Sequence, residues 1–151
     1  MATGSARPAL WTEIRAMLLA AMAIFVYTIS IGILNGTDAI DFNHKRILGH
    51  VHGGTLGWLT LAVFAASFWL FGEVRPLSAN EKKAARWLAI AGVLAFPCYV
   101  AAFSLTYGDA RPGFGILSTA VIAGFFIWVL MRARGSEDVY KRQILPPPPS
   151  S

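Results

Sequence analysis

Four long apolar stretches dominate this 151-residue chain and constrain its fold more than any other feature. A helix needs roughly 20 residues to cross a hydrocarbon core about 30 Å thick. The stretches that are long enough run over Ala16–Leu34, Ile47–Phe71, Trp87–Tyr107 and Gly113–Met131, and none of them contains Asp, Glu, Lys or Arg. With 56% hydrophobic and 14% charged residues overall, the sequence predicts an all-α membrane domain, a four-transmembrane-helix bundle over residues 1–134.

The basic residues divide unevenly between the segments that flank these spans. Ten of the thirteen Lys and Arg residues lie before the first span, between the second and third, or after the fourth; the others are Lys45, Arg46 and Arg111. Cytoplasmic segments of membrane proteins carry the excess of Lys and Arg. We therefore expect both termini inside, in a multi-pass protein of the cell inner membrane. Topology and attraction to anionic lipid account for the net charge of +5. We therefore expect the lipid bilayer as a partner, and we do not expect binding to nucleic acid.

Tryptophans mark the ends of the predicted spans. Trp11 precedes the first, Trp69 lies in the last turns of the second, Trp87 begins the third and Trp128 lies near the end of the fourth. Tryptophan is enriched at membrane interfaces, so we expect these four to anchor the helices there. Trp58 differs because it lies well inside the second span.

Residues 135–151 differ in composition from the rest of the chain. The segment "GSEDVYKRQILPPPPSS" has no apolar periodicity, and its run of prolines cannot continue a helix. Its piece "DVYKRQ" resembles translated sequencing-adapter read-through, an artefact of assembled sequences. The sequence therefore predicts a disordered tail beyond the membrane domain, with no part in function.

All three histidines of the chain lie within nine residues, in "HKRILGHVH". His44 belongs to the loop or to the first helical turn, whereas His50 and His52 lie one to two turns inside the second span. An ionisable side chain inside a bilayer is costly and marks a functional site by default. Three interpretations follow: structural histidines with satisfied hydrogen bonds, a relay for protons or metal ions, and ligation of a haem iron.

Helix geometry separates His50 from His52, because successive residues turn by about 100° and the two therefore point roughly 200° apart. They cannot both bind one ion in a regular helix. His50 shares its stripe with small residues, which allow close helix packing or the approach of a flat macrocycle: Gly53, Gly54 and Gly57. His52 shares its stripe with a bulkier apolar wall of the kind that lines a haem pocket: Leu48, Leu56, Leu59 and Val63. Helix geometry alone does not show which of the two histidines would ligate a haem.

The stretch "HVHGGTLGWLTL" resembles the second transmembrane helix of small, four-span relatives of subunit I of haem–copper oxidases and nitric oxide reductases. In that pattern a His-x-His pair is followed by a short apolar stretch and Gly-Trp, matched here by His50, His52, Gly57 and Trp58. In the large enzymes this helix carries a histidine that ligates the low-spin haem near the outer side of the membrane. The resemblance implies that His52 ligates a haem b and that His50 is the preceding histidine.

The resemblance also implies a role in electron transfer, in haem or gas sensing, or in assembly of a respiratory complex. Arg46 and Arg111 lie on the predicted outer side, where cations could pair with haem propionates. The large oxidases build a binuclear centre from further histidines on later helices, but this chain has none after His52. We therefore do not expect it to reduce oxygen or nitric oxide alone. A haem with two histidine ligands would need a second copy of the chain or a respiratory-complex subunit.

Two alternatives from other functional classes stay open. One is a small transporter in which His50 or His52 relays protons or metal ions. The other is a structural membrane subunit whose glycine face docks on a larger membrane protein.

Overall fold

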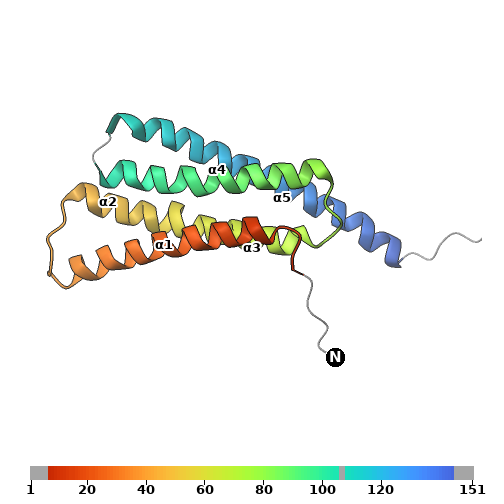
Figure 1. Ribbon diagram of the computed structural model, residues 1–151, viewed down its shortest axis with the longest axis horizontal. Coiled ribbons are helices and arrows are strands. Elements are labelled where there is room, and N and C mark those ends of the chain that lie inside the picture. The colour runs from red at the N-terminus through yellow and green to blue at the C-terminus, as the bar shows by residue number, and fades with distance from the viewer. Residues whose placement is uncertain (1–6, 106–107, 145–151) are drawn as a thin grey trace, which may run out of the picture.

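Four helical spans lie side by side in a single bundle (Figure 1). The computed structural model describes residues 7–105 and 108–144, with side chains up to residue 134. Within them, the helices that are long and apolar enough to cross a membrane are Trp11–Gly36, His44–Gly72, Ala79–Ser104 and Arg111–Arg134. No strand occurs in the described ranges. The predicted all-α bundle of four membrane helices is confirmed, although Tyr107, the predicted end of the third span, lies outside the described residues.

The second span consists of three consecutive helical segments. They are α2 (His44–His52), a π-helical segment η1 (Gly53–Leu59) and α3 (Thr60–Gly72). The first and third spans are the unbroken helices α1 (Trp11–Gly36) and α4 (Ala79–Ser104). A short 3-10 turn, η2 (Gly108–Ala110), leads into α5 (Arg111–Ile144). Helix α5 thus continues ten residues beyond the predicted domain boundary at 134, and residues 145–151 of the predicted tail lie outside the described residues.

Local sequence signals explain where two of the helices begin. The side chain of Asn43 accepts a hydrogen bond of 3.0 Å from the backbone N–H of Arg46, which caps α2. At the start of α4, Ser78 and Glu81 form a capping box, in which each side chain binds the other residue's backbone N–H. Such caps satisfy N–H groups that have no partner within the helix.

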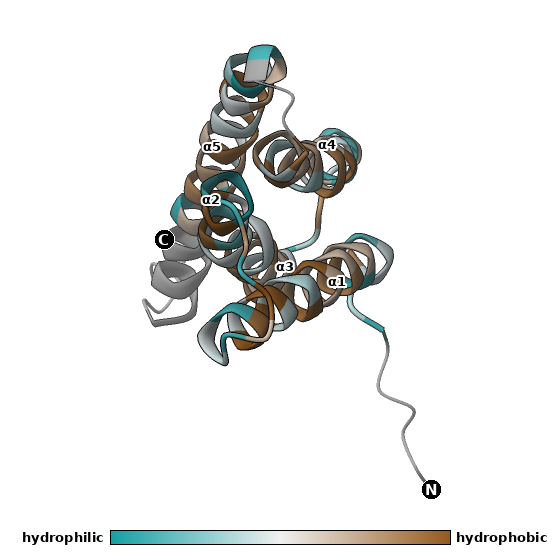
Figure 2. Ribbon diagram, turned by 90° about the vertical axis from the view of Figure 1, so that its left-hand side faces the viewer, coloured by the Kyte–Doolittle hydropathy of each residue, from teal (hydrophilic) through white to brown (hydrophobic). Residues whose placement is uncertain are grey.

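Aromatic side chains fill the buried core. The rings of Phe64 and Phe125 stack with centroids 3.6 Å apart, and Phe68 packs edge-on against Trp128 at 4.7 Å. Outside this core, many large apolar side chains are exposed on the bundle surface, and hydrophobic segments appear on each of the helices in the end-on view (Figure 2). Water would not tolerate so much apolar surface, whereas lipid does. These faces are therefore suited to contact with a bilayer.

Helix α5 covers only part of the bundle. Among the described residues it approaches α4, α3 and η2, but not α1, α2 or η1. The second span is therefore held mainly by α1 and α4 at the end that carries the histidines. We call this the histidine end, comprising residues 24–32, 44–57, 97–105 and Arg111.

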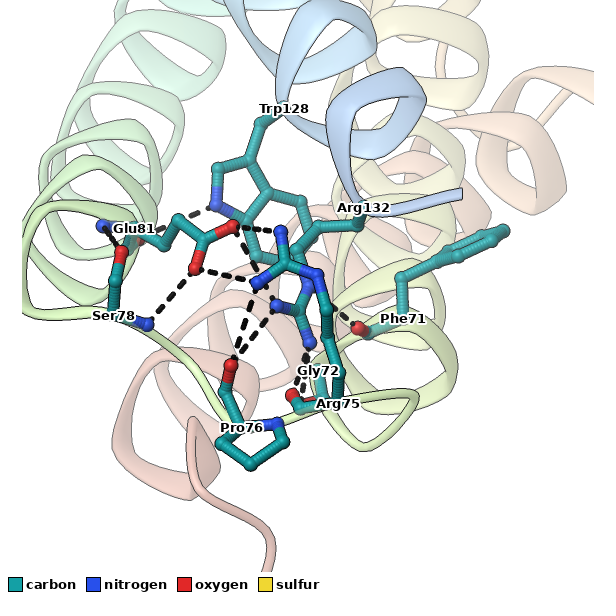
Figure 3. A network of polar contacts seen from close by, with 8 residues as sticks. All are labelled: Phe71, Gly72, Arg75, Pro76, Ser78, Glu81, Trp128 and Arg132. Atoms are coloured by element: carbon teal, nitrogen blue, oxygen red, sulfur yellow. Dashed lines mark hydrogen bonds and ion pairs between the residues drawn. The ribbon is translucent and has the colours of Figure 1, made fainter. Parts of the chain in front are cut away.

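At the opposite end, Arg132 is completely buried and ties α5 to the loop after α3 (Figure 3). Its guanidinium donates hydrogen bonds to four backbone carbonyls, those of Phe71, Gly72, Arg75 and Pro76. Its Nη1 also lies 3.5 Å from Oε1 of Glu81. The same carboxylate accepts hydrogen bonds from the two terminal guanidinium nitrogens of Arg75. The carbonyls of Phe71 and Gly72 end a helix and have no partner within it, so Arg132 acts as their cap.

Trp128 belongs to the same cluster, and its prediction as an interfacial anchor is wrong. The indole is only 4% exposed, and its Nε1–H donates to the carbonyl of Glu81 at 3.3 Å. Trp11, Trp69 and Trp87 are exposed, as anchors require. Trp128 differs because its side chain points into the bundle, which a sequence without an amphipathic pattern does not reveal.

Candidate functional site

Three glycines bring the second span into close contact with α1 and α4 at the histidine end. A Cβ at Gly49 would overlap the hydroxyl of Ser104. At Gly53 it would lie 2.8 Å from Thr28 Oγ1, and at Gly57 2.7 Å from Cγ2 of Ile24. The glycine face is therefore filled by helices of the same chain. Gly49, Gly53 and Gly57 therefore pack within the chain and are not free to dock on another membrane protein.

His50 points towards α1. Its Nδ1 lies 2.8 Å from the backbone carbonyl of Thr28, and its ring occupies the space that the absent side chain of Gly32 leaves open. A carbonyl oxygen only accepts, so Nδ1 must carry the proton, and in the neutral ring Nε2 carries a lone pair. The hydroxyl of Thr28 is buried and has no hydrogen-bond partner among the described residues.

His52 points towards α4. Its Nδ1 lies 2.8 Å from the carbonyl of Leu48, one turn earlier in its own helix, so its Nε2 also carries the lone pair when the ring is neutral. The imidazole stacks on Phe103 with centroids 4.0 Å apart and an interplanar angle of 16°, and Tyr99 lies edge-on at 5.6 Å. The orientation of this imidazole is therefore fixed by a hydrogen bond and by two aromatic rings.

Arg111 completes a stack of three side chains. Its guanidinium carbon lies 4.7 Å from the centroid of Phe103, and its Nε donates to the carbonyl of Ala102 at 3.2 Å. An imidazole at 4.0 Å and a guanidinium at 4.7 Å cannot share one face of a phenyl ring. Phe103 is therefore held between His52 and Arg111. Tyr99 and Arg111 also line a shallow groove of about 660 Å³ between α4 and α5.

Arg46 lies on a different side of the histidine end. It lines a groove of about 570 Å³ between α1 and α4, together with Tyr27 and Ser104. Of the two predicted propionate partners, the structure thus brings Arg111 near His52, whereas Arg46 precedes His50 by four residues on the same face of α2.

The π-helical segment changes which residues share a helix face with His50 and with His52. His50 and His52 lie in regular α-helix and diverge as predicted, towards α1 and α4 respectively. Beyond them, from Gly53 to Leu59, the backbone is π-helical, a form in which each N–H binds the carbonyl five residues earlier. Leu59 and Val63 are about half exposed, so the predicted leucine wall faces outwards and does not form a pocket. π-helical segments are rare and frequently occur at functional sites.

The described side chains could offer a haem iron one imidazole ligand at a time. Among residues 7–105 and 108–134, no three His, Cys, Asp or Glu side chains gather in a group that could hold a metal ion. His50 and His52 face different helices, so they do not chelate a shared ion. A haem needs only one axial imidazole with its other nitrogen hydrogen-bonded, and both histidines satisfy that requirement.

Sequence reasoning missed Phe103 and Thr28, the side chain and the carbonyl that position the two histidines. Nothing in a uniformly apolar span distinguishes the ring that packs on an imidazole from its neighbours. The glycines at 49, 53 and 57 were the one sequence signal for these contacts. Small residues spaced by four indicate the helix face on which neighbouring helices pack closely, here α1 and α4.

No protein-family model, curated protein or solved structure matches this chain. The likeness of the second span to haem–copper oxidase subunit I therefore stays a prediction from the residues of that span.

The close contact at Gly49 predicts a selective effect of added methyl groups. Gly49→Ala should destabilise the bundle by about 1–3 kcal/mol, because the new Cβ would meet Ser104. Gly113→Ala, where a Cβ meets nothing within 4 Å, is the matched control and should be neutral or slightly stabilising. Thermal unfolding in detergent measures both, and equal stability of the two variants would contradict the packing.

Proposed function

We propose that this chain is a haem b-binding integral membrane protein, related in its second span to haem–copper oxidase subunit I. The observation that carries the proposal is the imidazole of His52. Its Nδ1–H is bound to a backbone carbonyl, its plane is set by Phe103, and its neighbour Tyr99 lines a groove together with Arg111. A bound haem b would supply one-electron exchange or gas binding.

Each residue of this cluster has a defined part in the proposal. His52 would present Nε2 to the iron, and the carbonyl of Leu48 would fix the tautomer and raise the basicity of the ring. Arg111 would pair with a propionate through charge-assisted hydrogen bonds, which are stronger than bonds between neutral groups. Phe103 would prevent rotation of the imidazole about its side-chain bonds. His50, with Arg46 on the same helix face, is the second candidate for the ligand.

The proposed biological role is electron transfer, haem or gas sensing, or assembly of a respiratory complex in the inner membrane. A second axial ligand would come from another copy of the chain, giving a homo-oligomer, or from a respiratory-complex subunit. The competing function is a proton or metal-ion relay at His50, which the buried hydroxyl of Thr28 favours because it offers an unused polar group close to the second span.

Absorbance of the purified protein tests the proposal. Expressed with ample haem, the full chain should show a Soret band and a reduced-minus-oxidised spectrum typical of haem b. A colourless protein would overturn the proposal. Proton or Zn²⁺ flux into liposomes that contain such a colourless protein would then identify the relay.

The proposed topology places the histidine end at the outer side of the cell membrane and both termini in the cytoplasm, because the basic residues divide ten to three in that sense. Cysteine in place of Thr37 or Asn43 should react with an impermeant thiol reagent applied from outside, in a background where Cys98 is replaced by Ser. Cysteine in place of Asn80 should not react. The opposite pattern would invert the topology.

A further inference from the structure

The groove between α1 and α4 combines an apolar surface with a single cation at one end. It is lined by apolar residues of α1 from Ala20 to Ile31 and of α4 from Pro97 to Leu105. The eleven residue-to-residue steps from Ala20 to Ile31 span about 16 Å of helix, which is close to half of a hydrocarbon core about 30 Å thick. The groove therefore runs from the histidine end to the middle of the membrane, the depth of one lipid leaflet.

Arg46 lies at the mouth of this groove and is exposed. Its guanidinium lies 5.6 Å from the ring of Phe42 and forms no ion pair with a carboxylate in the part of the chain that the structure describes. Deeper in the groove, Tyr27 and Ser104 satisfy each other through a hydrogen bond of 2.7 Å between α1 and α4. The interior thus offers no unpaired polar side chain, and the one available charge lies at headgroup depth.

We propose that this groove binds an anionic phospholipid of the surrounding bilayer, with its phosphate at Arg46 and one acyl chain between α1 and α4. The charge fits a phosphate, and guanidinium binds phosphate oxygens through two parallel N–H donors. The volume of about 570 Å³ and the apolar walls fit a hydrocarbon chain. The site is separate from the proposed haem ligand, because neither His52 nor Arg111 lines it, so either proposal can fail without the other.

Native mass spectrometry of the delipidated full chain in detergent tests the headgroup contact. Dioleoyl phosphatidylglycerol should bind about fivefold more tightly than dioleoyl phosphatidylcholine, the effect expected for one interfacial cation. Arg46→Gln should abolish this preference, whereas Lys45→Gln, which removes the neighbouring charge outside the groove, should retain it. Equal binding of the two lipids by the unmodified chain, or equal effects of the two substitutions, would overturn the proposal.

A second pair of variants tests the acyl chain. Ala23→Trp places a bulky side chain in the groove and should weaken the first bound phosphatidylglycerol at least fivefold, whereas Ala66→Trp, at an exposed position on α3 outside the groove, should not. Circular dichroism should show equal helix content in both variants. Inorganic phosphate should fail to displace the lipid, because it lacks the chain. Displacement by phosphate, or equal effects of the two Trp variants, would overturn the proposal.

Discussion

His52→Ala should remove the haem b spectrum almost completely from the purified protein. The variant loses the only imidazole that lies between Leu48 and the rings of α4, where the proposed iron ligand is fixed by a hydrogen bond and by stacking on Phe103. His50→Ala should weaken or shift the spectrum without abolishing it, because His50 faces α1 at Thr28. A reduced-minus-oxidised difference spectrum, normalised to protein, measures both effects.

His44→Ala is the matched control, since the third histidine of the cluster begins α2 and is exposed. It should leave the spectrum unchanged. His52→Gly offers a sharper test, because it leaves a space of imidazole size against Phe103. Added imidazole should then restore the Soret band of that variant but not of His50→Gly. A spectrum lost with His50→Ala and retained with His52→Ala would move the ligand to the face that contacts α1.

Phe103 is a positioning residue in this proposal, and its substitution should affect haem differently from loss of the ligand. Phe103→Leu keeps an apolar side chain but removes the ring that stacks on His52 and carries Arg111 on its other face. Haem content should therefore stay near that of the unmodified protein, while the midpoint potential and the Soret position shift.

The spans of this chain could be predicted from the sequence because lipid imposes a strong and simple constraint. Every backbone group must be satisfied within a helix, and every exposed side chain must be apolar. Charged residues therefore delimit the spans, and the structure places all four helices where uncharged apolar stretches lie. The divergence of His50 from His52 was equally predictable, since it depends only on helical rotation.

The contacts between the helices could not be predicted in the same way. Leucine and phenylalanine are both strongly apolar, so the pattern does not distinguish Leu59, which is exposed, from Phe103, which packs on His52. The π-helical segment at Gly53–Leu59 also shifts every side chain that follows it. Arg132 was counted as one of the cations that set topology, whereas its guanidinium is buried and bound to backbone carbonyls.

Arg132→Ala should destabilise the bundle by about 3–5 kcal/mol, because it leaves several backbone carbonyls without a donor. The guanidinium is inaccessible, and its donors satisfy the carbonyls of Phe71 and Gly72 at the end of α3 and those of Arg75 and Pro76 in the following loop. Without Arg132 these acceptors lose their partner beside an aromatic core. Thermal unfolding in detergent, followed by circular dichroism, measures the loss.

Arg134→Ala separates this cap from a general effect of removing positive charge. Arg134 lies two residues further along α5 and is exposed, so its loss should change stability by less than about 0.5 kcal/mol. Arg132→Lys should fall between the two, because an ammonium has three donors and cannot match the fixed fork of five that reaches several carbonyls at once. If Arg132→Ala yields no folded protein, Arg132→Lys still gives a graded value. Equal unfolding temperatures for Arg132→Lys and the unmodified chain would show that positive charge, and not the geometry of the guanidinium, holds α5 to the loop after α3.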